Sequence, residues 1–404
     1  MNWSCKEIRK LDELLSGYLG NSATIKDVKT SQLSKPGENY GSIIYGLEIT
    51  VENNENKTEE TLHTIAKVLP HDELMRELFR VQTTYTNEMG FYKIIVPTVS
   101  EFQKELTGLT SYLDCFPKCF AARKNLLENN DRIDDDAVLL LENLKHRGFD
   151  NIDKRKGFDI ETTKMVLRSL AQFHGVPLAI KIKKPNLFKE KLLPFCTDFY
   201  RQNGLMPQVI PLFKIITSED PDVKEIVSKL ERWEGAQRIL LREPFSTLVH
   251  DDVWTNNTMQ KFDSNGDPVA NKMVDFQILS HGSPAIDLFF YLWTSVSLEH
   301  IKTHFDYFLE YYHEHLTQVL ETYGIDTTPF SYEAFLDEIH AIGPFEMLHA
   351  FFFIVFAIHG REGGYSTAGL PDVSDINSTV PIEAKEKVWY MVKECYKRGW
   401  FRSL

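Results

Sequence analysis

Cysteine is scarce in this sequence, and its distribution excludes a disulfide-stabilised scaffold. The 404 residues include five cysteines: Cys5, Cys115, Cys119, Cys196 and Cys395. Disulfide scaffolds instead carry an even number of cysteines in a short secreted chain. Cys115 and Cys119 are close in sequence, but no second cysteine or histidine pair follows them at zinc spacing. We therefore expect free thiols that are buried or partly buried.

The chain has fewer basic residues than acidic ones. The chain has 45 lysines and arginines against 58 aspartates and glutamates, which gives a formal net charge of -13 at pH 7. A broad nucleic-acid surface needs a basic face that releases counterions, so this charge argues against nucleic acid as a partner. A nucleotide ligand stays compatible, because one lysine and a few backbone amides can hold a phosphate.

Long uninterrupted apolar runs are also missing. The first residues, MNWSCKEIRK, are charged early and are not followed by the apolar core of a signal peptide. The most apolar stretch, residues 344–360, contains Glu346, His349 and His359, and is therefore too short and too polar to span a bilayer. We expect a cytoplasmic protein that does not enter a membrane.

Apolar periodicity in the first third of the chain indicates a small sheet with helices. Residues 3–19 have the spacing of an amphipathic helix, and residues 73–95 are also helical in pattern. Alternating apolar residues over 42–51 and 61–69 predict strands. The short apolar run 138–141 suits a buried strand.

The rest of the chain is mainly helical in pattern. Helical spacing predominates after Asp159, apart from a β-rich island with strands at 247–250 and 272–276 joined by a polar loop. This order predicts an α+β fold with two lobes. The N-lobe, residues 1–141, would bind the nucleotide phosphates, and the larger helical C-lobe, residues 142–404, would carry the catalytic loop and the acceptor pocket.

The strongest chemical signal lies in that island. Residues 250–257 read HDDVWTNN, and Asp275 and a phenylalanine follow the second strand. Phosphoryl transfer needs one carboxylate for the acceptor hydroxyl, and an amide oxygen and a second carboxylate to hold Mg²⁺ against ATP. Asp252, Asn257 and Asp275 supply these groups in the order H-x-D-x-x-x-x-N…D-F of kinase-like phosphotransferases. Aspartate and asparagine are also common in turns, but their order between two apolar strands favours the kinase interpretation.

A lysine and a glutamate upstream agree with that interpretation. Lys67 lies in the second predicted strand, where a lysine can reach the α- and β-phosphates of ATP. Glu88 follows 21 residues later on a predicted helix and could pair with Lys67, with Glu77 as a weaker rival. Such charges are usually solvated at a surface, so only their order and spacing favour the functional interpretation.

Two further segments are candidates for ATP binding. Asn39 and Ser42 belong to a Gly-rich stretch before the first strand of the 42–51 pattern, where backbone N–H groups could close over phosphates. Gly–Asn clusters more often make hairpin turns, so this signal depends on its position before Lys67. Glu142 and Leu144 end the buried strand at the lobe boundary, where backbone groups would meet the adenine edge. A simple strand end would give the same pattern.

Short motifs occur in a fixed order from about residue 37 to residue 295. They are residues 37–40 (GENY) with Ser42, 66–67 (AK), 88–92 (EMGFY), 140–144 (LLENL) with 148–149 (GF), 170–174 (LAQFH), 250–257, 275–277 (DFQ) and 282–288 (GSPAIDL). With these motifs the sequence resembles the ecdysteroid kinase-like family, which is related to choline kinases and aminoglycoside phosphotransferases. The resemblance implies a protein-kinase-like bilobal fold.

The resemblance also implies a role for each matching residue. Asp252 would be the catalytic base, and Asn257 and Asp275 would be the Mg²⁺ ligands. Lys67 would hold the phosphates of ATP, with Glu88 as its partner. The activity known for the family is ATP-dependent phosphorylation of a steroid hydroxyl, as in moulting hormones, and related members are proposed to phosphorylate foreign compounds during detoxification.

Two residues near the catalytic loop would have structural roles, and a third departs from the family pattern. Asp287 would brace the loop close to His250 rather than touch the substrate. The family usually has glycine where this chain has Asp251. Aspartate tolerates left-handed backbone geometry better than most residues, and its carboxylate would raise a neighbouring pKa.

The sequence separates three classes of function. A protein kinase is disfavoured, because only eight residues lie between Asp275 and Pro284, and Gln277 stands where protein kinases have glycine. A nucleotide-binding pseudokinase is supported only by Asp251, since the lysine and the metal ligands are present. A small-molecule O-kinase with ATP and an alcohol as substrates, and without an obligate protein partner, is favoured.

The acceptor is not determined by the sequence. Seven aromatic residues could line an apolar pocket for a steroid-sized alcohol or could be helix core: Phe290, Tyr291, Trp293, Phe351, Phe352, Phe353 and Phe356. A choline-like substrate would instead need aromatic rings and carboxylates around its ammonium group. Residues 363–378 could form a lid over the cleft or a plain surface loop.

Overall fold

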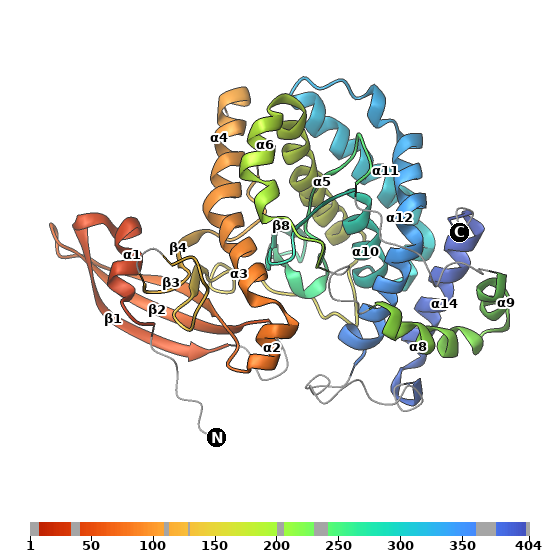
Figure 1. Ribbon diagram of the computed structural model, residues 1–404, viewed down its shortest axis with the longest axis horizontal. Helices are drawn as coiled ribbons and strands as arrows, with labels where there is room; N and C mark the ends of the chain where they lie inside the picture. The colour runs from red at the N-terminus through yellow and green to blue at the C-terminus, as the bar shows by residue number, and fades with distance from the viewer. Residues whose placement is uncertain are drawn as a thin grey trace.

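The computed structural model describes residues 8–33, 41–108, 113–127, 130–199, 206–229, 241–360 and 377–400. A β-rich part formed by the first 142 residues lies beside a larger helical part (Figure 1). The predicted α+β fold class, with a small N-terminal sheet and a helical C-terminal part, is confirmed.

The N-terminal part is built on a five-stranded sheet. Its strands are β1 (Ala23–Gln32), β2 (Ile43–Asn53), β3 (Glu59–Val68), β4 (Cys119–Arg123) and β5 (Val138–Glu142). They lie in the order β1-β2-β3-β5-β4, and all neighbouring strands are antiparallel. Strand β3, which carries Lys67, is therefore central, with Lys67 opposite Ile44 on one side and Leu139 on the other.

The two faces of this sheet are buried against different partners. Val138 and Leu140 belong to a cluster with Leu15 of helix α1 (Leu11–Leu19). Leu139 and Leu141, which point the other way along the same strand, belong to the main core of the molecule. Burial on both faces explains why β5 reads as an uninterrupted apolar run.

A long helical passage joins the two parts of the molecule. After the short helix α2 (Glu73–Leu78), it consists of α3 (Val81–Gly90), the π-helical segment Phe91–Ile95 and α4 (Val96–Thr107). Helix α3 contacts strand β3 through Tyr85 and Glu88, whereas α4 packs on helix α5 (Ile160–Lys183) of the C-terminal part (Figure 1). The same passage therefore contributes to both sides of the boundary.

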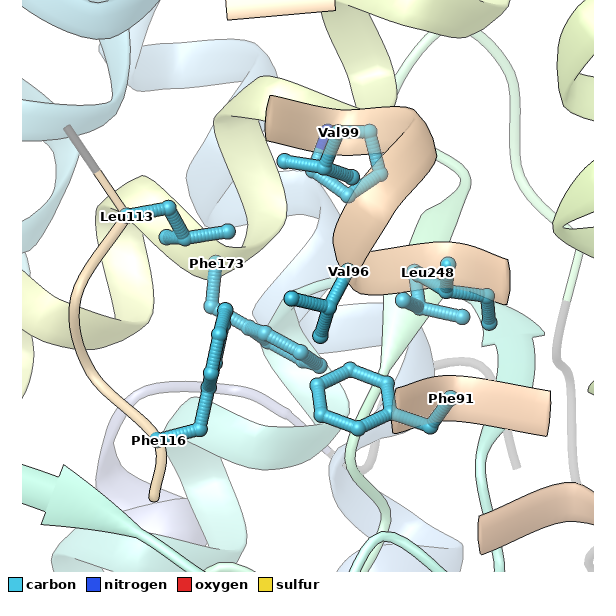
Figure 2. Close-up of a pocket in the computed structure, with 9 residues that line it drawn as sticks. Phe91, Val96, Val99, Leu113, Phe116, Phe173 and Leu248 are labelled. Atoms are coloured by element: carbon cyan, nitrogen blue, oxygen red, sulfur yellow. The ribbon is translucent and has the colours of Figure 1, made fainter. Parts of the chain in front are cut away.

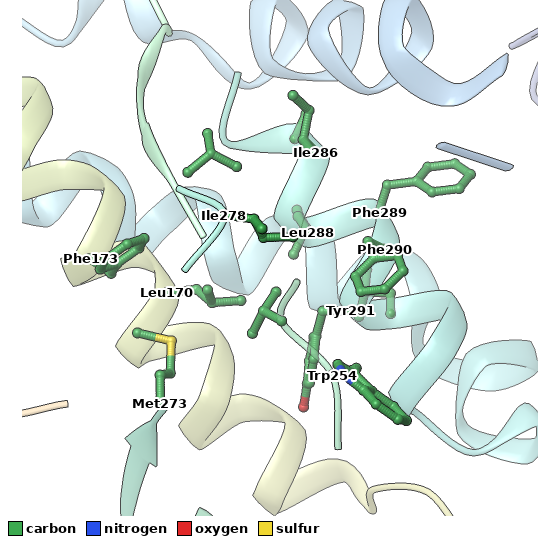
Figure 3. Packing of buried hydrophobic residues seen from close by; sticks show 14 of the residues in the cluster. Leu170, Phe173, Trp254, Met273, Ile278, Ile286, Leu288, Phe289, Phe290 and Tyr291 are labelled. Atoms are coloured by element: carbon green, nitrogen blue, oxygen red, sulfur yellow. The ribbon is translucent and has the colours of Figure 1, made fainter. Parts of the chain in front are cut away.

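The C-terminal part consists mainly of packed helices. They are α5 (Ile160–Lys183), α6 (Pro185–Lys191), α8 (Met206–Ser218), α9 (Pro221–Lys229), α10 (Ala285–Ser295), α11 (Leu298–Thr322), α12 (Tyr332–Phe352) and α14 (Ile382–Lys397). Helices α5 and α11 pack side by side, and every residue of α10 is buried. Figure 3 shows Leu288, Phe290 and Tyr291 of α10 together with Leu170 and Phe173 of α5 in this core.

Short strands in the C-terminal part position the catalytic loop. Strand β6 (Thr247–Val249) pairs with β9 (Ser280–Gly282), and β7 (Thr258–Phe262) pairs with β8 (Pro268–Met273). The prediction of a strand over 272–276 was wrong at its end. Strand β8 stops at Met273, because Asp275 has a left-handed backbone angle φ of 70° that a strand cannot continue through.

Helix α12 continues into a second π-helical segment, Phe353–Ile358. The stretch Tyr332–Ile358 is long and apolar enough to cross a membrane by length and composition, but 72% of its most apolar window is buried within the protein. That burial is typical of a core helix. The four cysteines in the described residues, Cys115, Cys119, Cys196 and Cys395, are free thiols as expected.

Candidate active site

Lys67 of strand β3 lies between two carboxylates. Its Nζ is 2.6 Å from Oε2 of Glu88 on helix α3 and 2.7 Å from Oδ1 of Asp275, which follows strand β8. Lys67 and Glu88 are 4% and 1% exposed. Glu88, not the exposed Glu77 of α2, is therefore the carboxylate beside Lys67. Side chains from both parts of the molecule meet at this lysine.

Burial and charge act against each other in this cluster. Burial alone would lower the pKa of Lys67, but Asp275 and Glu88 outweigh burial and raise it. Burial raises the pKa of Glu88 to about 7, with Asp275 adding to the rise and Lys67 opposing it. Lys67 therefore stays cationic, as a group that binds phosphate must.

Asp252 and Asn257 are joined directly. The side-chain amide of Asn257 donates to Oδ2 of Asp252 at 2.8 Å and to the backbone oxygen of Asp252 at 2.9 Å. Burial, together with the negative charge of Asp275, raises the pKa of Asp252 well above its usual range, while the Asn257 bond opposes the rise. Oδ1 of Asp252 is buried and has no hydrogen-bond partner among the described residues, which leaves it as the free acceptor atom of this carboxylate.

A buried carboxylate braces the backbone of the catalytic loop. Asp287 of α10 accepts hydrogen bonds from the backbone N–H groups of His250, at 2.8 Å, and of Asp251, at 2.7 Å. Its Oδ2 is also 2.9 Å from Nε2 of His174, whose Nδ1 bonds to the hydroxyl of Tyr312 at 2.7 Å. Burial would raise the pKa of Asp287, but His174 outweighs burial and lowers it. The loop is thus anchored by an ionised group.

His250 connects the catalytic loop to the segment that carries Asp275. Its Nε2 lies 3.0 Å from the backbone oxygen of Val274, and because a carbonyl only accepts, this nitrogen carries the proton. The backbone N–H of Val274 donates in turn to the backbone oxygen of Asn257 at 2.9 Å. These two bonds fix the position of Asp275 relative to Asp252.

Asp251 occupies a left-handed position, with φ of 69°. Glycine adopts this geometry without steric cost, and aspartate is among the side chains that tolerate it best. Asp251 is 1% exposed, so its carboxylate lies inside the protein close to Asp252. An aspartate thus occupies a backbone geometry that glycine adopts most readily.

The other sequence candidates for ATP binding lie in different surroundings. Asn39 lies outside the described residues, and Ser42 is buried at the start of β2. The carboxylate of Glu142 is 3.1 Å from Arg147, and the backbone N–H of Asn143 donates to the oxygen of His63 at 3.1 Å. Leu144 packs in a small apolar cluster with Phe149 and Met259. The end of strand β5 is thus held by contacts with both the N-terminal and the C-terminal part.

Sequence reasoning missed one residue that holds the catalytic loop. The side-chain amide of Asn151 lies 3.2, 3.0 and 3.0 Å from the backbone oxygens of Thr255, Asn256 and Thr258. An isolated asparagine in a polar stretch gives no signal for such a role. Its neighbour Asp150 pairs with Gln260 of β7, and that pairing keeps the amide in place.

A protein family and solved structures are similar to this chain. A sequence model of the ecdysteroid kinase-like family matches residues 36–325, which is more than two thirds of the chain. The chain belongs to the ecdysteroid kinase-like family. The predicted family is thereby confirmed, and membership of it supports a small-molecule kinase.

Other comparisons are less informative about this ecdysteroid kinase-like protein. No curated protein matches it. Among solved structures, a mutant of aminoglycoside 2′-phosphotransferase-IIIa in its GDP complex is similar over 96% of this chain and 99% of its own, with 10% sequence identity and a TM-score of 0.40.

An apolar cavity in this ecdysteroid kinase-like protein lies behind the site (Figure 2). It is lined by Phe91, Ile95, Val96, Val99, Leu113, Phe116, Phe173, Pro177 and Leu248. The cavity measures about 10 Å³, which leaves room for one water molecule at most, and its lining offers that water no polar partner. It is a packing gap and not a ligand site.

The predicted aromatic residues of the family member divide into two groups. Phe290, Tyr291, Trp293 and Phe351 are fully buried and belong to the helix core. Phe352, Phe353 and Phe356 are partly exposed at the end of α12. Most of the predicted lid, residues 363–378, lies outside the described residues.

Proposed function

We propose that this protein transfers the γ-phosphoryl group of ATP to a hydroxyl group of a small molecule, with an ecdysteroid as the first candidate acceptor. The observation that carries the proposal is the convergence of Lys67, Glu88 and Asp275 within ion-pair distance. A strand lysine, a helix carboxylate and a carboxylate after the catalytic loop are the groups that kinase-like phosphotransferases use for ATP. The family name supports the ecdysteroid.

Lys67 and Asp252 would have different roles in this reaction. Lys67 would bind and orient the nucleotide phosphates, with Glu88 holding its ammonium group in place. Asp252 would orient the acceptor hydroxyl and take up its proton at the buried Oδ1. The raised pKa of Asp252, caused first by burial, makes this carboxylate a stronger proton acceptor than an exposed aspartate.

Mg²⁺ fits the groups that surround Asp275. The described residues contain no cluster of three or more His, Cys, Asp or Glu side chains suited to hold a metal alone. Mg²⁺ bound with ATP needs only one or two protein oxygens, because phosphates and water complete its coordination. Asp275 and the amide oxygen of Asn257 would supply them. When bound, Mg²⁺ neutralises charge that develops on the phosphates.

The test is ATP consumption by the purified protein with Mg²⁺ and a panel of ecdysteroids, choline, plant glycosides and phenols. Transfer to a steroid hydroxyl, absent in Asp252→Asn, would support a hormone kinase. Transfer only to foreign alcohols or phenols would indicate a detoxification kinase. ATP binding without transfer to any compound would overturn the proposal in favour of a pseudokinase.

A further inference from the structure

Three fully buried side chains from three helices form a chain of hydrogen bonds that ends at the catalytic loop. They are Tyr312 of α11, His174 of α5 and Asp287 of α10, and each is 0% exposed. Nδ1 of His174 lies 2.7 Å from the Tyr312 hydroxyl, and Nε2 lies 2.9 Å from Oδ2 of Asp287. Asp287 accepts from the backbone N–H groups of His250 and Asp251. The sequence motifs include His174 and Asp287 but not Tyr312.

The direction of the bond between Tyr312 and His174 follows from the protons that are present. Burial, followed by the charge of Asp287, raises the pKa of Tyr312 well above its ordinary value, so the phenol keeps its proton. Within the described part of the chain, Nδ1 of His174 is the acceptor at hydrogen-bond distance from this hydroxyl. A buried O–H group without an acceptor is costly, so Tyr312 donates to Nδ1. That nitrogen therefore carries no proton.

The state of His174 determines what Asp287 faces. A histidine ring without a proton on Nδ1 is neutral and carries its one proton on Nε2, which here donates to Oδ2 of Asp287. The carboxylate thus accepts one hydrogen bond from the ring and two from the loop backbone, which favours its ionised form. A charged imidazolium would instead compete with the two backbone N–H groups for the same negative charge.

The backbone that Asp287 holds is the one that carries the proposed base. Asp251, whose N–H is held at 2.7 Å, directly precedes Asp252 and has the left-handed φ of 69°. Helix α5 reaches this segment a second time, because the backbone oxygen of His174 accepts from the hydroxyl of Thr247 at 2.8 Å, at the start of strand β6. The orientation of His174 therefore affects the catalytic loop and the strand that leads into it.

We propose that Tyr312 is a positioning residue for the phosphoryl transfer. Its hydroxyl proton fixes His174 in the neutral form protonated at Nε2, and this form leaves the charge of Asp287 to the backbone of the catalytic loop. The inference rests on the proposed function for the reaction that the loop carries out. It deepens that function by assigning a role to a residue of α11 that acts through two others.

The protonation of His174 is measured by ¹⁵N NMR on the full chain at neutral pH. The chain has 13 histidines, and the signals of His174 are those that disappear in His174→Gln. We expect a proton on Nε2 and none on Nδ1 in the wild type. In Tyr312→Phe nothing donates to Nδ1, so the charge of Asp287 should bring a second proton onto the ring in a measurable share of molecules. A wild-type ring that carries a proton on Nδ1, or a ring unchanged by Tyr312→Phe, would overturn the proposal.

The consequence for transfer is measured by steady-state kinetics with the acceptor that the wild type uses. Tyr312→Phe should lower kcat about tenfold, because a small displacement of a catalytic group slows the reaction. Affinity for a non-hydrolysable ATP analogue should change little, since Lys67 is held by its own contacts with Glu88 and Asp275. A split between kcat and nucleotide affinity is the result that a general loss of folded protein would not give.

Tyr291→Phe is the matched control for the loss of a buried hydroxyl. Tyr291 is also 0% exposed, but it lies in α10 outside the chain of hydrogen bonds. Both tyrosine variants should lower the melting temperature by similar amounts, and only Tyr312→Phe should lower kcat. Equal losses of kcat in the two variants would overturn the proposal.

Two variants of His174 test the neutral form of the ring. The amide of His174→Gln can donate to Asp287 and accept from Tyr312, as the neutral ring does, whereas His174→Leu can do neither. The glutamine variant should therefore keep several-fold more transfer activity than the leucine variant. Equal activities would contradict a ring that both donates and accepts.

The measurements separate this inference from the proposed function. A wild type that transfers phosphate to no acceptor would overturn the kinase function. The control of His174 by Tyr312 would still be supported by a change in ring protonation in Tyr312→Phe, and overturned by an unchanged ring. With transfer present, an unchanged kcat in Tyr312→Phe would overturn the positioning role alone.

Discussion

Two π-helical segments lie near the candidate site, and their aromatic side chains differ in burial. On the nucleotide side, the π-helical segment Phe91–Ile95 places Phe91 in a stack on Phe276, next to Asp275, with ring centres 3.7 Å apart. A second π-helical segment places Phe353 against Trp254, in the loop that carries Asp252. Phe91 is 1% exposed, whereas Phe353 is partly exposed.

This difference has a physical reason. The nucleotide side must hold Lys67, Glu88 and Asp275 in one geometry, and buried ion pairs tolerate little displacement. Close packing of Phe91 on Phe276 supplies that rigidity. An acceptor site beside Phe353 would need apolar surface that a substrate can cover. Variants on each side should therefore fail differently.

The largest effect is expected from Asp252→Asn. Loss of a general base costs about 10²- to 10⁴-fold in rate, while the amide keeps the shape of the side chain. The nucleotide side is untouched, so affinity for an ATP analogue should stay near that of the wild type. Steady-state kinetics measures the loss of transfer, and titration with the ATP analogue measures the unchanged affinity. Full activity in this variant would exclude Asp252 as the base.

The next largest effect is expected from the fully buried Phe351, compared with the partly exposed Phe352. Phe351 packs edge to face on Phe213, with ring centres 5.0 Å apart, and is fully buried. Phe351→Ala should lower the free energy of unfolding by about 3–5 kcal/mol, as expected for a core Phe→Ala cavity. Phe352→Ala should cost less than half of that. Urea denaturation of both variants measures the difference, and equal losses would show that Phe352 contributes to stability as a core residue does.

Glu88 should make stability depend on pH in a defined window. Burial raises its pKa from 4.5 to about 7 in the folded protein, so between these values the folded chain holds a proton that the unfolded chain has lost. Stability from this group therefore falls as pH rises through the window, with a slope of at most about 1.4 kcal/mol per pH unit. The stability difference between wild type and Glu88→Gln, followed by urea denaturation, should fall from pH 4.5 to 7 and then level off. A difference independent of pH would contradict the raised pKa.

Asp275→Asn should weaken binding of the nucleotide more when Mg²⁺ is present than when it is absent. Replacing the carboxylate removes a metal ligand and one partner of Lys67, but Glu88 remains beside that lysine. We expect at least about a tenfold loss of affinity with Mg²⁺, a change comparable to the loss of other metal-supporting groups, and a smaller one with EDTA. Calorimetric titration in both buffers measures the two losses of affinity. Equal losses would show that Asp275 is not a metal ligand.

The sequence predicted those parts of the molecule in which pattern and environment agree. Strands β2 and β3 alternate because each has a buried face. Asp252 and Asn257, singled out by their spacing, lie in one loop and are hydrogen-bonded to each other. Strand β1 was not predicted, because it is an edge strand whose residues are nearly all exposed and show no alternation.

Tertiary contacts explain the other gaps. Strand β4 is short and lies at the opposite edge of the sheet, so its five residues carry little pattern. Asn151 acts through backbone oxygens more than a hundred residues away, which no local spacing reveals. The end of β8 depends on the backbone angle of Asp275, and residue type alone does not indicate a positive φ there.

The smallest effect, and the one that bears on catalytic competence, is expected at Asp251. Its φ of 69° disfavours a Cβ, so Asp251→Ala should lose about 1 kcal/mol of stability relative to Asp251→Gly. The glycine variant also removes a charge that helps to raise the pKa of Asp252, although burial and Asp275 contribute more. The base would then ionise at lower pH, and the acidic limb of the transfer rate should shift to lower pH. Rates measured from pH 5 to 8 would show that shift. A large gain in rate at neutral pH on Asp251→Gly would instead mean that Asp251 suppresses catalysis and holds this protein near a state that binds nucleotide without transfer.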